Sequence, residues 1–75
     1  MKKNTFTLRP TDEFIELVKL LKLQQIAQTG GHAKIMVTDG LVKVNGELEY
    51  RKRKKLRAGD TIEVEGFMIE IASEG

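Results

Sequence analysis

The sequence contains no cysteine and no tryptophan, and it has only one histidine, one serine, one tyrosine and one proline. The absence of cysteine excludes a disulfide framework, a thiolate metal site and a cysteine nucleophile. A lone His32 and a lone Ser73 leave almost no material for a histidine-based zinc site or for serine–histidine catalysis. We therefore expect no metal, no cofactor, no small-molecule substrate and no enzymatic activity.

Long apolar runs are also absent. The richest apolar stretch, residues 14–23, is interrupted by Glu16, Lys19 and Lys22. A membrane-spanning helix or the apolar part of a signal peptide needs an uninterrupted stretch. Together with the absence of cysteine, this pattern favours a cytoplasmic protein without a membrane partner.

The chain has 75 residues, of which 40% are hydrophobic and 32% are charged. This composition is typical of a folded protein rather than of a disordered one. The length is sufficient for one small core and too short for two, so we expect a single domain over residues 1–75.

The charge is distributed unevenly along the chain. Residues 51–57, which we call the basic segment, hold six of the 13 lysines and arginines and no acid. The other residues carry seven cations against 11 acids, a balance of −4, although the whole chain is +2. One concentrated basic segment on a slightly acidic domain indicates a polyanionic partner.

Two helices are predicted in the first half of the chain. The first covers residues 12–23, with Thr11 as its N-cap and apolar residues at helical spacing. Thr29 is a suitable N-cap for a second helix, and Asp39-Gly40 ends it because glycine readily adopts a left-handed conformation. Ile26 is expected to pack in the corner between the helices.

After Gly40 the apolar pattern changes to alternation, which is typical of strands. Asn45-Gly46 predicts a hairpin with positive φ at both turn positions. Strands are expected around residues 42–44, 48–50, 62–64 and 67–71, and a short strand is expected before Pro10. The predicted fold is α+β, with two helices on one face of a small antiparallel sheet of three to four strands.

Several groups near the basic segment could bind phosphate oxygens. Lys34 and Lys43 should face solvent, and the first turn of the second helix offers free backbone N–H groups beside His32. The basic segment by itself would also fit a solvated loop or a nuclear localisation signal.

Aromatic side chains are few. The three phenylalanines, Phe6, Phe14 and Phe67, fit core positions, and only Tyr50 adjoins the basic segment. Stacking of splayed bases is therefore disfavoured, and recognition of phosphates and RNA shape fits better.

These motifs resemble the S4-type RNA-binding domain, first known from a small-subunit ribosomal protein. The resemblance rests on residues 29–34, on the Asp39-Gly40 helix end, on residues 42–46 and on Gly59-Asp60, and it covers residues 14–66. It implies a two-helix αL motif packed on a small sheet, with RNA bound by the second helix and the adjoining loop. Many members have Ser-Arg where this chain has Thr29-Gly30, so His32 or backbone N–H groups would replace that contact. Asn45 and Gly46 are interpreted as turn residues.

The sequence therefore predicts a non-enzymatic, monomeric protein that binds structured RNA, such as ribosomal or transfer RNA, through backbone phosphates. The alternative is a protein-interaction adaptor that docks its basic segment on an acidic partner. The expected RNA-binding residues are Thr29, Gly30, Gly31, His32, Lys34, Lys43, Arg51, Lys52, Arg53, Lys54, Lys55 and Arg57.

Overall fold

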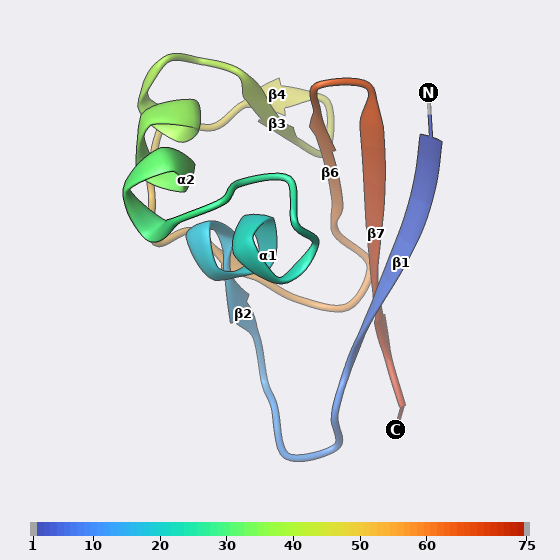
Figure 1. The fold of residues 1–75 in the computed structure, drawn as a ribbon. Helices are drawn as coiled ribbons and strands as arrows, with labels where there is room; N and C mark the ends of the chain where they lie inside the picture. Colours follow the sequence, from blue (N-terminus) through green and yellow to red (C-terminus); the bar gives the residue numbers. More distant parts are fainter. Residues whose placement is uncertain (1, 75) are drawn as a thin grey trace.

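The computed structural model of the protein describes residues 2–74. Its strands are β1 (Lys2–Leu8), β2 (Ile15–Glu16), β3 (Val42–Val44), β4 (Glu47–Leu48), β5 (Lys55–Leu56), β6 (Thr61–Val64) and β7 (Phe67–Ser73). Its helices are α1 (Leu17–Leu23) and α2 (Gly30–Thr38). Figure 1 shows both helices on the same side of the main sheet. The predicted α+β class, with two helices packed on a sheet, is confirmed.

The main sheet has five strands in the order β1-β7-β6-β3-β4, and β2 and β5 form a separate two-stranded sheet. The expectation of an antiparallel sheet with three to four strands is corrected at one edge. There β1 pairs with β7 in parallel, from Lys2 opposite Phe67 to Leu8 opposite Ser73 (Figure 1). Such pairing uses backbone groups along a whole strand, and the side-chain pattern of residues 2–4 does not reveal it.

Helix α1 begins five residues later than the sequence predicts. Ile15 and Glu16 pair with Leu56 and Lys55 as antiparallel strands, so the chain is extended where the helical pattern had already begun. Glu16 is the N-cap and makes no side-chain capping bond. The prediction that Thr11 caps this helix is wrong, because long-range pairing with the basic segment determines where the helix starts.

Helix α2 agrees with its prediction. The Thr29 hydroxyl accepts a hydrogen bond from the His32 backbone N–H at 3.0 Å, as an N-cap should. Gly40 follows the helix with φ +75°, the left-handed conformation expected at its end. Ile26, in the connection between the helices, is partly buried against the core, as expected.

The hairpin between β3 and β4 also agrees with its prediction. Asn45 has φ +53° and Gly46 has φ +85°, as a type I′ turn requires. The Asn45 amide reaches beyond its own turn: Nδ2 donates to the Asp60 carboxylate at 3.0 Å, and Oδ1 accepts from the Thr61 N–H at 2.9 Å. The predicted turn residue therefore also joins the hairpin to the start of β6.

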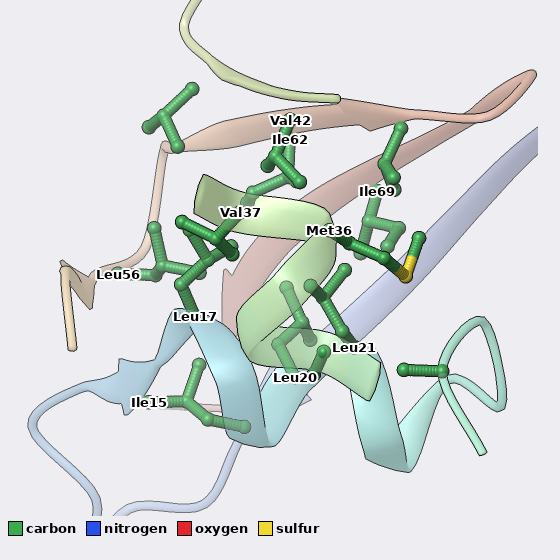
Figure 2. Packing of buried hydrophobic residues seen from close by; sticks show 14 of the residues in the cluster. Ile15, Leu17, Leu20, Leu21, Met36, Val37, Val42, Leu56, Ile62 and Ile69 are labelled. Atoms are coloured by element: carbon green, nitrogen blue, oxygen red, sulfur yellow. The ribbon is translucent and has the colours of Figure 1, made fainter. Parts of the chain in front are cut away.

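The core lies between the helices and the sheet (Figure 2). It includes Leu56, the one apolar residue of the basic segment, which is fully buried. Burying a leucine stabilises a fold by about 1.5–3 kcal/mol, so Leu56 anchors the basic segment to the domain. Its fully buried partners come from both layers: Leu17, Leu20 and Leu21 in α1, Val37 in α2, and Val42, Ile62 and Ile69 in the sheet. Within residues 2–74, no helix is both long and apolar enough to span a membrane.

Candidate nucleic-acid interface

A cleft of about 550 Å³ separates α1, the start of α2 and the basic segment. Five cations and one acid line it, so its local charge is strongly positive. Four of the residues that the sequence predicts for the site line the cleft: Gly30, Lys34, Lys52 and Arg53. Its other lining residues are Glu16, Val18, Lys19 and Lys22. We call this feature the basic cleft.

The N-terminus of α2 forms one wall of the basic cleft. The backbone N–H groups of Gly30 and Gly31 belong to the first turn and have no partner inside the helix, which favours a bound anion. The cap uses the His32 ring as well, because Nδ1 accepts a hydrogen bond from the Gln28 N–H at 3.3 Å. With Nδ1 used in this way, Nε2 is the ring atom left to contact a phosphate.

Lys22 lies beside this helix terminus. Its Cδ atom is 3.9 Å from the position that a Cβ atom would occupy at Gly30. The lysine stem therefore lies next to the helix start, where its positive charge adds to the positive end of the helix dipole.

Backbone hydrogen bonds hold the basic segment against α1. The carbonyl oxygens of Lys54 and Lys52 accept from the N–H groups of Leu17 at 2.9 Å and Val18 at 3.3 Å. These are donors that a helix N-terminus leaves without a partner. The end of the segment is held too, since the Asp60 carboxylate accepts from the Arg57 N–H at 2.8 Å. The segment therefore has an ordered backbone with most of its charged side chains exposed.

Arg51 differs from the other cations of the basic segment. Its Nε and Nη2 atoms donate to the two carboxylate oxygens of Glu49, at 2.9 and 3.1 Å, and its backbone N–H donates to the same group at 3.0 Å. Glu49 is buried. The hydrogen bonds from the Arg51 side chain lower the pKa of Glu49, outweighing the opposite effect of burial. Arg51 thus neutralises a buried carboxylate.

Lys55 and Arg57 lie against the ring of Phe14. The Lys55 Nζ atom is 4.9 Å from the ring centroid, and the Arg57 guanidinium carbon is 5.8 Å from it. Both distances are within the range of cation–π attraction. Phe14 is half-buried rather than a full core residue.

The basic segment also forms a shallower groove of about 350 Å³ with its own side chains, among them Lys54. Within residues 2–74, Lys52 and Lys54 form no ion pair. Arg53 faces Glu16 at 3.9 Å, but its side chain is 91% exposed, so this contact is weak. Lys52, Arg53 and Lys54 are therefore available to an anion, in addition to the exposed Lys55 and Arg57 beside the Phe14 ring.

The structure does not bring Lys43 to the basic cleft. Val42 and Val44 point into the core, so Lys43 lies on the face of the sheet away from the helices. There it is opposite Glu63 in β6 and Leu48 in β4. Its charge is on the opposite side of the sheet from the charges of the cleft.

Lys19 and Lys22 were not among the expected site residues. In the sequence they appear only as polar interruptions of the apolar stripe of α1. Their spacing of three residues puts them on one face of the helix, and the packing of α1 beside α2 turns that face toward Lys34. Among the described residues, no group of three or more histidine, aspartate or glutamate side chains could hold a metal ion.

The two-helix motif, the sheet and the capped start of α2 define a class of protein. The sequence model of the S4 domain matches residues 8–72, and the chain belongs to the S4 domain family.

Individual relatives are similar over most of their length. An Escherichia coli protein named "Putative RNA-binding protein YbcJ" is 41% identical over 59 residues, which cover 79% of this chain and 84% of the relative. A Bacillus subtilis protein named "Probable ribosome maturation protein RlbA" is 44% identical over 55 residues, covering 73% and 78%. The solution structure of YbcJ from E. coli, described as having an αL motif involved in RNA binding, matches with a TM-score of 0.67 and 40% identity. That match covers 91% of this chain and 85% of the YbcJ chain.

Proposed function

We propose that the protein binds RNA and that the basic cleft holds the RNA backbone. The observation that carries this proposal is the grouping of five cations and one acid around the N-terminus of α2. Lysines, an arginine and free backbone N–H groups are the donors that contact phosphate oxygens, and they do so without reading base edges. The names of the relatives in E. coli and B. subtilis support the same conclusion, and they give no support to the adaptor hypothesis.

The proposed site comprises the α2 terminus, the cleft lysines and the exposed part of the basic segment. Thr29, Gly30, Gly31, His32 and Lys34 contribute from α2, and Lys19 and Lys22 contribute from α1. Lys52, Arg53 and Lys54 supply the charges of the basic segment, with Lys55 and Arg57 at its far end. Arg51 supports the segment through Glu49, and Lys43 lies outside the site.

The proposed ligand is structured RNA, such as ribosomal or transfer RNA. The basic segment is held in place at several backbone positions, so the points from which its charged side chains extend have a fixed spacing, which favours a folded phosphate backbone. The relative named as a ribosome maturation protein supports a ribosome-related RNA. We propose further that the protein acts as a non-enzymatic monomer in the cytoplasm, where such RNA is found.

Two double variants that remove the same charge test the proposed site. Lys22→Gln with Lys52→Gln removes two cations from the basic cleft, and Lys3→Gln with Lys43→Gln removes two cations from the opposite face of the sheet. At 0.1 M salt, each lost phosphate contact should cost about fivefold in affinity, so the cleft variant should bind an RNA hairpin more than tenfold more weakly. The control variant should bind within about twofold of wild type.

The measurement is a fluorescence anisotropy titration with a labelled hairpin and with an unstructured strand of equal length. The hairpin should bind more tightly than the strand. An equal loss of RNA affinity in the two double variants would show that net charge alone determines binding. Equal affinity of the wild-type protein for the hairpin and the unstructured strand would overturn the preference for structured RNA. Tight binding of an acidic protein fraction without any RNA binding would favour the adaptor instead.

A further inference from the structure

A second groove, of about 400 Å³, opens on the other side of α1. Leu8 and Ile15 form its floor and are buried, at 3% and 6% exposure. Its walls include Phe6, Phe14 and Leu23, and Leu23 is 54% exposed although it is a large apolar residue. The groove is concave, with an apolar floor and a rim that is partly polar, and its volume is in the range of small-ligand sites. We call it the aromatic groove.

The aromatic groove continues the basic cleft. Glu16 and Lys19 line both features, so a ligand in one is next to a ligand in the other. Arg9 also lines the groove, and Asp12 accepts a hydrogen bond from its Nε atom at 3.2 Å. The charges that line the groove balance, because Asp12 and Glu16 stand beside Arg9 and Lys19, so a negatively charged part of a ligand would be attracted by the cations of the adjoining basic cleft. The groove itself offers apolar contact to a flat part of the same ligand.

Phe14 connects the two kinds of surface. Its ring lines the groove, while Lys55 and Arg57, which approach the ring to 4.9 and 5.8 Å, do not line it. The cations therefore contact the ring from outside the groove. A group that contacts Phe14 within the groove would therefore lie near two further positive charges.

We propose that the aromatic groove binds one unpaired base of the same RNA whose phosphates occupy the basic cleft. This inference rests on the RNA-binding function proposed above. A nucleotide supplies both a flat apolar face and a charged phosphate, and stacking of bases on aromatic side chains is a recurrent mode of RNA recognition. Because the groove adjoins the strongly positive basic cleft, and because Lys55 and Arg57 approach the Phe14 ring, an RNA base fits it better than a neutral peptide side chain does.

This inference changes the expectation from the sequence, in which all three phenylalanines were core residues. Phe14 is next to Ile15, which is fully extended in β2, and this pairing leaves the preceding ring only half-buried. A helix starting at residue 12 would have turned Phe14 into the apolar stripe.

The test compares two RNAs and two variants of equal charge. One RNA is a hairpin with a four-nucleotide loop, and the other is the same stem as a blunt duplex with an equal number of phosphates. Phe14→Leu keeps an apolar wall but removes the stacking surface, and Phe67→Leu removes a half-buried aromatic ring in β7 as a control. Phe14→Leu should weaken hairpin binding at least fivefold, the lower end of what one base–aromatic stack contributes, and should change duplex binding less than twofold. Phe67→Leu should change neither.

Equal weakening of hairpin and duplex by Phe14→Leu would overturn the inference, because the ring would then only position Lys55 and Arg57. The inference would also be overturned if Phe14→Leu bound both the hairpin and the duplex as tightly as wild type does. If the wild-type protein bound neither the hairpin nor the duplex, the proposed function itself would be refuted. A second measurement uses the wild-type protein, so it does not depend on whether a variant folds. In NMR spectra of the wild-type methyl groups, the signals of Ile15 and Leu23 should shift when the hairpin is added and should not shift when the duplex is added. Signals that do not change with the hairpin would contradict the inference.

Discussion

The backbone N–H of Leu17 donates to the carbonyl oxygen of Lys54 at 2.9 Å. One hydrogen bond thus joins the first residue of α1 to the middle of the basic segment. The contact serves both partners: it satisfies a helix donor that would otherwise lack a partner, and it fixes the position of a chain whose side chains repel one another. The charged surface is therefore arranged before RNA binds.

We expect the basic segment to be ordered in the free protein. Because Leu17 and Val18 donate to it, their amides should be protected from hydrogen exchange to nearly the same extent as the amides of α2. Backbone order parameters for residues 51–57 should be near 0.85, the value typical of rigid structure. Values below about 0.6, with rapid exchange at Leu17, would show that the segment becomes ordered only when RNA binds.

The Glu49–Arg51 pair should make stability depend on pH. The pKa of Glu49 is below its ordinary value of 4.5, mainly because of the hydrogen bonds from the Arg51 side chain. A carboxylate with a lowered pKa stabilises the folded state above the ordinary value, and that contribution is lost as the pH falls through the lowered one. Glu49→Gln should therefore cost about 1–3 kcal/mol at pH 7, and the difference from wild type should shrink as the pH falls below the ordinary value of 4.5 and through the lowered pKa.

Urea unfolding at pH 7, 4 and 2 measures this effect. Glu47→Gln is a suitable control, because Glu47 is exposed in β4, two residues away. It should leave the free energy of unfolding within about 0.5 kcal/mol of wild type at every pH. A constant difference between Glu49→Gln and wild type across this range would contradict the role given to the ionised carboxylate.

Gly46→Val should destabilise the hairpin. Gly46 has φ +85°, and no atom lies within 4 Å of the position that its Cβ would occupy, so backbone strain rather than crowding sets the cost. A β-branched residue in this conformation should cost about 1–3 kcal/mol. Each kcal/mol lowers the melting temperature of a domain of this size by roughly 4–8 °C.

Gly30→Ala is the matched comparison for Gly46→Val. A Cβ at Gly30 would meet only the Lys22 side chain, at an ordinary 3.9 Å, and the residue is helical. This variant should be as stable as wild type or slightly more stable, because alanine favours helix. If both variants melted at the wild-type temperature, the strain argument for Gly46 would be wrong.

Local patterns predicted much of the fold. The Thr29 cap, the glycine after α2 and the Asn45-Gly46 turn depend on neighbouring residues, and all three are confirmed. The start of α1 was predicted wrongly, because it depends on pairing with residues about 40 positions away in the chain. The parallel pairing of β1 with β7 was missed for the same reason.

The candidate site was predicted less completely. The positive charge of residues 51–57 was evident in the sequence, but Glu49, just before it, binds Arg51 through contacts that only the fold reveals. Alternation correctly pointed Lys43 away from the core, yet only the sheet topology shows that this direction leads away from α2. Conversely, Lys22 appears in the sequence only as a polar interruption of an apolar stretch, and the packing of the two helices places it beside Gly30.

The salt dependence of RNA binding tests most directly whether the basic cleft holds the RNA backbone. If its cations neutralise about four phosphates, the logarithm of the wild-type affinity should fall against the logarithm of salt concentration with a slope of roughly −3. Lys22→Gln with Lys52→Gln should reduce the slope to about −1.5, since each lost contact removes about 0.7, and Lys3→Gln with Lys43→Gln should leave it near −3. An unchanged slope in the cleft variant, or an equal reduction in the control variant, would show that the RNA backbone lies elsewhere.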